Sequence, residues 1–351
     1  MEGPRGVKDE KELESAVRLA DAVFYSGKKP RSMRDDFPLL FSKSNTENLR
    51  VFVDNGKVIS LVGAVFGDIV LFGHRIPAVR LGAVCTDPEY RGRGLATSLL
   101  ADTERFAVRK GAVVAVISGA RGLYERFGAV DAGRFWKYTL ETKMLRRFDA
   151  VDIRPAVYGD LPRLARAYAE KAVRFERRYD DFNSLFTASM ALDRPAQIFI
   201  HEGDSSDICS YIVVVRDTKG ILNCVEYAGD PLRVVGMLRS LSEGEGETVV
   251  VHTIAADRTM NHLLSLVSQP EINKVPRTWK ILSREGLFAS LNNYFAERLP
   301  QSEVAAIQEL MGKIDGPELT RVVFGTAKLP IVTEAGSPFP IPLPAYGMDY
   351  L

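Results

Sequence analysis

The chain has 351 residues, with 46 Lys and Arg against 45 Asp and Glu, which gives a formal charge of +1. This length leaves room for two domains and a third, smaller one. A hydrophobic share of 46% with 26% charged residues is typical of a folded globular protein. The balanced charge argues against binding nucleic acid or an anionic membrane through bulk charge, so we expect neither as a partner.

Neither the N-terminal segment nor any apolar run predicts export or membrane insertion. The first residues lack the apolar core of a secretory signal, and no apolar stretch reaches the ~20 residues that span a bilayer. Cys85, Cys209 and Cys224 lie far apart without CxxC spacing, and the histidines show no metal-ligand spacing. We therefore expect a cytoplasmic protein without a metal site.

Residues 1–148 show an α+β order, with antiparallel hairpins first and a β-α-β unit last. Asn55-Gly56 between β-branched runs is the strongest of the turn signals. The predicted elements are a helix over 13–24, a hairpin at Asn55-Gly56, a second hairpin ending in a strand at 74–86, a helix over 94–110 closed by Gly111, a strand over 112–117 and a short helix around Tyr124.

Residues 149–278 repeat this order of elements. The predicted elements are a short strand near 153, a helix starting near Asp160, strands over 197–202, 210–217 and 221–229, a helix over 230–241 and a strand over 248–254. We infer two copies of one fold, each a mixed central sheet flanked by helices.

Residues 279–351 form a third segment. Helices are predicted over 286–298 and 301–313, and four prolines between 338 and 344 favour an extended tail. The apolar end of this tail, with Tyr350 and Leu351, is suited to docking. A disordered terminus is the alternative.

The most informative stretch is the loop 91–96, between a strand that ends at Thr86 and the helix that follows. Gly92 and Gly94 remove side chains where backbone amides must face a ligand, and the helix start adds unpaired N–H groups. Arg91 and Arg93 supply positive charge. The loop therefore predicts a pyrophosphate site, while its spacing excludes the Rossmann, Walker and protein-kinase loops.

The 91–96 loop resembles the Arg/Gln-x-x-Gly-x-Gly/Ala signature of the GNAT N-acetyltransferases, met here by Arg91, Gly94 and Ala96. Tyr124 and Gly128 match a second feature of that family, Tyr-x-x-x-Gly. The resemblance implies acetyl-coenzyme A as the acyl donor. It is typical of the multidomain branch related to the enhanced-intracellular-survival acetyltransferases.

That branch implies three parts. They are a catalytic GNAT domain over 1–148, a degenerate GNAT-like domain over 149–278, and a short sterol-carrier-like module with a docking tail over 279–351. In the second domain the Arg-x-x-Gly spacing is absent and Asp230 would repel phosphate, so we expect that copy to have lost coenzyme A binding.

The resemblance also assigns roles to single residues. Val84 and Thr86 would offer backbone groups to the pantetheine arm and the thioester. Tyr124 would donate a proton to the departing thiolate. The pyrophosphate would be held by Arg91, Gly92, Arg93, Gly94, Leu95 and Ala96.

The residues near the loop do not identify the general base. No Glu precedes the loop on its strand, in contrast to many members of the superfamily. In the branch that the chain resembles, the terminal carboxylate serves as the base, so we hypothesise this role for the α-carboxylate of Leu351 near Tyr124; the alternative is a tail that only packs between domains.

The expected function is direct transfer of an acetyl group to a primary amine of a small molecule or peptide. Transfer of another acyl group, and a coenzyme A sensor without transfer, are the alternatives. A homo-oligomer is compatible with the sequence. The acceptor is not specified by the sequence, because acceptor pockets are built from variable loops, here residues 25–45 and the later domains.

Overall fold

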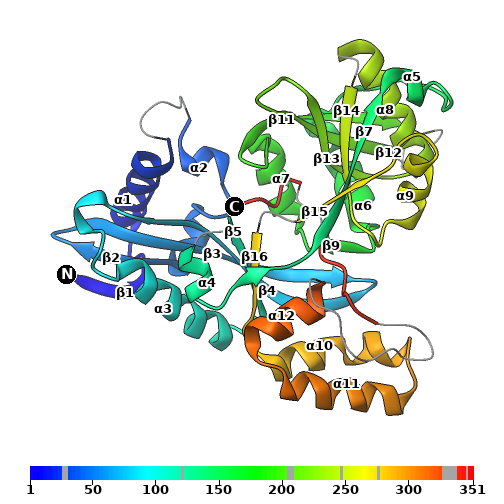
Figure 1. Ribbon diagram of the computed structural model, residues 1–351. Helices are drawn as coiled ribbons and strands as arrows, with labels where there is room; N and C mark the ends of the chain where they lie inside the picture. Colours follow the sequence, from blue (N-terminus) through cyan, green and yellow to red (C-terminus); the bar gives the residue numbers. More distant parts are fainter. Residues whose placement is uncertain are drawn as a thin grey trace. The chain divides into compact units, whose positions relative to one another are not determined.

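The computed structural model describes residues 1–25, 31–119, 122–203, 209–245, 248–274, 277–325, 338–344 and 347–351 (Figure 1). The chain divides into two compact units. Unit 1 comprises Met1–Ala132, Pro276–Ile341 and Leu351, and unit 2 comprises Gly133–Val275 and Pro342–Tyr350. Each unit combines one mixed sheet with helices, so the α+β class is confirmed.

Unit 1 begins with a strand and a helix, continues with antiparallel hairpins and ends with helices. Its elements are β1 (Glu2–Gly6), α1 (Glu10–Ala20), the π-helix η1 (Asp21–Tyr25), α2 (Met33–Asp36), the 3-10 helix η2 (Lys43–Asn48), β2 (Leu49–Asp54), β3 (Lys57–Leu71), β4 (His74–Thr86), the 3-10 helix η3 (Pro88–Tyr90), α3 (Leu95–Arg109), β5 (Val114–Ser118), α4 (Gly122–Arg126), β6 (Val130–Asp131), β16 (Arg277–Ile281), α10 (Arg284–Ala296), α11 (Gln301–Lys313) and α12 (Gly316–Phe324).

The sheet of unit 1 has the order β1-β2-β3-β4-β5-β16-β6. The β4–β5 pair is parallel and α3 connects its two strands, whereas the other neighbouring strands in this order are antiparallel. The predicted hairpin at Asn55-Gly56 is confirmed, because both residues have positive φ angles of 48° and 75°, as a type I′ turn requires. Gly111, with φ of 87°, follows the end of α3 as expected.

The core beside the parallel pair is formed by α3 and the strands that it covers. Leu95, Leu99 and Leu100 of α3 pack on alternating apolar residues of β3, β4 and β5. The buried members of this cluster are Phe52, Ile59, Val62, Ala64, Val79, Leu81, Val84, Leu95, Leu99, Leu100, Ala107, Ala112, Ala115, Ile117, Tyr124 and Ala129. This packing fixes the start of α3 next to the end of β4.

Unit 2 has a sheet of the same kind. Its elements are β7 (Arg134–Glu141), α5 (Thr142–Leu145), β8 (Arg154–Pro155), the 3-10 helix η4 (Tyr158–Asp160), α6 (Leu161–Ala169), β9 (Val173–Phe175), α7 (Tyr179–Ala188), β10 (Met190–Ala191), β11 (Arg194–Glu202), β12 (Cys209–Arg216), β13 (Leu222–Ala228), α8 (Pro231–Glu245), β14 (Thr248–Thr253), α9 (Arg258–Ser265) and β15 (Glu271–Lys274). The strand order is β10-β11-β12-β13-β14-β7-β15, and β13 and β14 are parallel with α8 between them.

Two strands pair in a different sheet from the strands that precede them in the sequence. β16 follows β15 in the chain but pairs with β5 and β6 in unit 1, and β7 follows β6 but pairs with β14 and β15 in unit 2. The sequence did not reveal this exchange. The boundaries near 148 and 278 follow the repeat of elements and stay predictions.

The sterol-carrier-like module is not confirmed. Trp279, where we expected this module to begin, is a core residue of β16 and only 1% exposed. The helices that follow pack within unit 1, α10 against β4 and α12 against β16. Among the described residues, no helix has both the length and the apolar character that a membrane span requires.

Candidate active site

The 91–96 loop presents backbone groups to solvent at the start of α3. Gly92 and Gly94 have φ angles of 77° and 73°, and a Cβ built on either would meet no atom within 4 Å. Gly94 is the N-cap of α3, and no side chain caps the first N–H groups of this helix. These amides and the helix dipole are therefore available to an anionic ligand, as the sequence predicts.

Both arginines of the loop extend along it. The Nε of Arg91 donates to the carbonyl of Thr86 at 3.3 Å, and Arg93 donates to the carbonyl of Glu89 at 3.3 Å. The Arg93 guanidinium also lies 4.8 Å from the ring centre of Tyr90. Neither side chain forms an ion pair with a carboxylate in the part of the chain that the structure describes, so both charges can serve a phosphate.

The approach to the loop is held by hydrogen bonds at the end of β4. The Asp87 carboxylate accepts from the backbone N–H of Glu89 at 3.1 Å and from Lys57 Nζ at 2.6 Å. The hydrogen bond from Lys57 lowers the pKa of Asp87. The Tyr90 hydroxyl donates to Asp54 at 2.9 Å. These contacts fix the turn that leads into the 91–96 loop.

The parallel strands β4 and β5 separate before they end. Their register runs from Ala78 opposite Val114 to Leu81 opposite Ile117, and β4 then continues to Thr86 without β5 as its partner. Ala83 has a φ of 50°, and the register with β3 shifts at this point, so β4 carries a bulge. Val84, a predicted site residue, lies directly after the bulge, and the Thr86 hydroxyl is 2.8 Å from that of Ser60.

The predicted acid and the predicted base both lie at the end of β5. Leu351 is 7% exposed, and an oxygen of its carboxyl group accepts a hydrogen bond from the Ser118 hydroxyl. A Cβ built on Gly82 would lie 3.0 Å from the Leu351 Cβ, so Leu351 fills the gap where β4 and β5 separate. Tyr124 is buried, and a Cβ on Gly119 would lie 3.9 Å from its Cε2.

Sequence reasoning missed the residues that receive Leu351. Gly82 interrupts a strand, which is a signal of close backbone approach that could have been used. Ser118 and Thr278 carried no signal, because their role depends on pairing between β5 and β16. The Thr278 hydroxyl donates to the carbonyl of Gly119 at 3.4 Å and so supports the same strand end.

The corresponding loop of unit 2 is closed by a side chain. β13 ends at Ala228, and Asp230 precedes α8. Oδ1 of Asp230 accepts from the N–H groups of Leu232 and Arg233 at 2.8 and 3.1 Å. The donors that α3 leaves free are thus occupied in α8, and by a negative charge. This arrangement disfavours a phosphate there.

Comparison with known families identifies the domain around the 91–96 loop. Residues 5–130 match the model of the acetyltransferase (GNAT) domain. Unit 1 contains a GNAT acetyltransferase domain. The chain is accordingly an acyltransferase, and the GNAT resemblance stated from the sequence is confirmed.

Solved structures share the fold over most of the chain. A probable N-acyltransferase from Enterococcus faecalis V583 is 16% identical, with a TM-score of 0.62 over 80% of this chain and 72% of that one. A GCN5-related N-acetyltransferase from Kribbella flavida is 17% identical, with a TM-score of 0.61 over 81% and 73%. Eis1 from Mycobacterium abscessus is 16% identical, with a TM-score of 0.59 over 82% and 75%. No curated protein matches the chain.

No metal centre is found in the described ranges of the chain, because no three His, Cys, Asp or Glu residues gather there as ligands. Cys85 is buried and 5% exposed, as is typical of a small apolar core residue.

Proposed function

We propose that unit 1 transfers the acetyl group of acetyl-coenzyme A to a primary amine of a small molecule or peptide. This proposal rests on two features that lie in the same GNAT domain. An uncapped, glycine-rich helix start follows β4, while Tyr124 and Leu351 lie at the end of β5. The first feature suits the donor's pyrophosphate, and the second suits proton transfer at the thioester.

In this proposal the donor is held by charge and by backbone amides. The free N–H groups of the 91–96 loop, with Arg91 and Arg93, bind the pyrophosphate. The bulge at Ala83 takes the backbone near Val84 out of regular pairing with β3, which makes it available to the pantetheine arm. Thr86 is paired with Ser60, and we keep its role at the thioester oxygen as a proposal from the family resemblance.

The reaction then needs one base and one acid. The amine nitrogen attacks the thioester carbonyl, its proton passes to the Leu351 carboxylate, and the carbon–sulfur bond breaks. Tyr124 donates a proton to the leaving thiolate. The buried position of Leu351, which is 7% exposed, keeps its carboxylate at the strand end where the proposal needs the base. No covalent enzyme intermediate is required.

The acceptor segment proposed from the sequence is only partly described. In its described part, the Tyr25 hydroxyl donates to the buried Asp36 at 2.6 Å, and Ser32 caps α2. Residues 26–30 of this segment lie outside the described residues. A primary amine remains the proposed acceptor class.

A coenzyme A sensor and transfer of another acyl group are the competing functions. Both would use the 91–96 loop, but a sensor would not need Tyr124 and Leu351 at one strand end. The Asp230 cap supports the proposal that unit 2 does not bind the donor. We also retain as proposals the cytoplasmic location and the derivation of α10–α12 from a sterol-carrier-like module.

Gly94→Glu tests the donor site. The glutamate side chain would enter open space with a negative charge where the pyrophosphate is proposed to bind, so we expect loss of acetyl-coenzyme A binding in calorimetry. Gly73→Glu is the matched control, because Gly73 also has a positive φ and open space but lies in the β3–β4 hairpin turn. Unchanged donor affinity in a folded Gly94→Glu protein would refute the assignment of this loop.

A further inference from the structure

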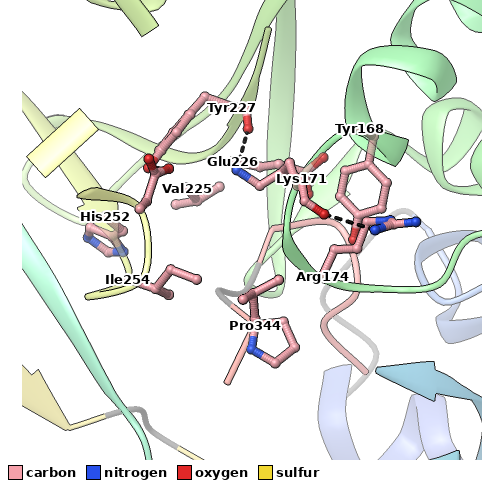
Figure 2. Close-up of a pocket in the computed structure, with 11 residues that line it drawn as sticks. Tyr168, Lys171, Arg174, Val225, Glu226, Tyr227, His252, Ile254 and Pro344 are labelled. Atoms are coloured by element: carbon pink, nitrogen blue, oxygen red, sulfur yellow. Dashed lines mark hydrogen bonds between the residues drawn. The ribbon is translucent and has the colours of Figure 1, made fainter. Parts of the chain in front are cut away.

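The C-terminal tail lies in unit 2 near the place where β13 and β14 separate. Residues Pro342–Tyr350 belong to this unit. The parallel register of β13 and β14 ends with Cys224 opposite Val251, although both strands continue. Pro344 of the tail and Glu226 of β13 line one pocket beyond this point (Figure 2). The separated strands of unit 2 are therefore bounded by a segment from the end of the chain.

A buried ionic cluster holds the last part of this tail. The Arg177 guanidinium donates to the Asp349 carboxylate at 2.9 and 2.7 Å, and to the Glu226 carboxylate at 2.9 and 2.6 Å. The side chains of Arg177, Glu226 and Asp349 are 1%, 3% and 0% exposed. The guanidinium also lies 3.8 Å from the ring centre of Tyr168, which restricts its orientation.

The backbone of the tail is fitted to the same cluster. The Met348 N–H donates to Oε2 of Glu226 at 3.2 Å. Gly347 has a φ of 107°, and a Cβ built on it would collide with the Glu226 carboxylate. Glycine suits this position because it combines a positive φ with a close approach to another group. Both a side chain and the backbone of the tail are thus recognised by unit 2.

Packing alone does not account for the second carboxylate of the cluster. Glu226 by itself neutralises Arg177, and an apolar side chain at position 349 would dock without the desolvation cost of a buried charge. Asp349 adds a defined geometry, since the planar guanidinium holds its carboxylate partners in fixed directions. Two residues span at most about 7 Å, so the position of Asp349 limits that of Leu351.

We propose that Arg177 is a positioning residue for the transfer reaction: it holds Asp349 and thereby keeps the Leu351 carboxylate at the end of β5. This inference rests on the proposed function, in which Leu351 is the base. Arg177 acts only through the tail. Unit 2 then contributes to the reaction by fixing the end of the chain, although Asp230 closes its own phosphate loop.

The experiment compares full-length variants by turnover, by acetyl-coenzyme A affinity in calorimetry, and by the rate at which a carboxypeptidase releases Leu351. Asp349→Ala leaves Arg177 paired with Glu226, so the cluster keeps a neutral ion pair. Leucine release should become about 10- to 100-fold faster, because the docked tail loses charge-assisted hydrogen bonds. Turnover should fall about 10- to 100-fold at unchanged donor affinity, the usual cost of misplacing a reacting group by about 1 Å.

Asp160→Ala is the matched control. Asp160 is also buried in unit 2, at 2% exposed, and accepts from Arg154, which has a second partner in Glu202. The substitution therefore removes a comparable ion pair outside the tail. Its turnover and its rate of leucine release should stay at the parental values.

Gly347→Ala is a second variant, which displaces the tail by collision and removes no charge. It should act as Asp349→Ala does, and it decides the question if Asp349→Ala fails to fold. Gly220→Ala controls for backbone strain, because Gly220 also has a positive φ, 81°, but a Cβ there would meet no atom within 4 Å. This control should behave as the parent does.

A combined variant separates positioning from a general weakening of the fold. Asp349→Ala is added to a protein with residues appended after Leu351, whose free carboxylate is already lost. A positioning role predicts no further loss of turnover in this protein. A merely structural role predicts the same loss in both backgrounds, since independent effects add.

Three outcomes have different meanings. Parental turnover in folded Asp349→Ala and Gly347→Ala proteins would overturn the positioning role and leave the proposed function standing, so long as the appended residues lower turnover. Equal losses in both backgrounds would also overturn it. Full turnover in the extended protein would instead refute Leu351 as the base, and with it the positioning role of Arg177.

Discussion

Tyr124 lies within the core cluster under α3, yet its ring reaches the backbone at Gly119. Tyr124→Phe removes only the hydroxyl, so the fold and the donor affinity should persist. Turnover should fall by about 100- to 10,000-fold, the usual effect of losing a general acid. Steady-state kinetics and calorimetry on the same preparations would separate rate from binding.

A second buried tyrosine supplies the control for that substitution. Tyr138 is fully buried in unit 2 and donates a long hydrogen bond of 3.4 Å to the carbonyl of Asn261. Tyr138→Phe should leave turnover unchanged. Parental turnover in Tyr124→Phe would make Tyr124 a packing residue and move the search for the acid elsewhere.

The two helix starts show how a single residue can decide ligand binding. Gly94 leaves the first amides of α3 open, whereas the carboxylate of Asp230 accepts from the first amides of α8. The helices occupy the same place in the order of elements, between two parallel strands. In unit 2 a negative side chain occupies the place at the helix start where an anion would bind. Unit 1 has no such side chain at the start of α3.

At the scale of elements, the tail is the segment whose end matters most for the proposed chemistry. Leu351 is buried, and its Cβ and carboxyl group lie against Gly82 and Ser118. Residues appended after Leu351 would remove the free carboxylate and would not fit between β4 and β5. Such an extended protein should lose about 100-fold or more in turnover and keep near-parental acetyl-coenzyme A affinity.

The same residues inserted after Lys219 provide the control, because Lys219 is exposed in the turn between β12 and β13. This protein with the inserted turn should be fully active. Full activity in the C-terminally extended protein, with unchanged thermal stability, would show that Leu351 only packs.

Local elements were predictable where short-range signals decide them. The Asn55-Gly56 turn and the helix ending before Gly111 follow from glycine and asparagine in positive-φ positions. The position of Tyr124 on a short helix was also expected and found. The partners of a strand are set by long-range packing instead. The sequence of β16 does not indicate that Trp279 pairs with Val116. The contacts of Leu351 depend on the sheet of unit 1 that this pairing helps to form.

At the scale of the whole molecule, the two repeats of the sequence do not coincide with the two compact units. The difference arises because β7 pairs in unit 2 and β16 pairs in unit 1. β16 pairs with β5 over five residues and places Trp279 in the core of unit 1. A protein cut at residue 148 keeps β7 but lacks β16. Strand β5 would then expose unpaired backbone groups, and β6 would lose its neighbour.

We therefore expect residues 1–148 alone to give no cooperative thermal unfolding and to aggregate. A matched chain restores the missing strand by joining Ala132 to Arg277 through about two turn-forming residues and continuing to 325. This link is short enough because Asp131 and Thr278 are paired antiparallel neighbours, so the connection becomes an ordinary hairpin. Circular dichroism and calorimetry should show cooperative unfolding for the joined chain only. A folded, cooperative 1–148 fragment would mean that β16 is dispensable and that the repeat, rather than the compact unit, is the independent domain.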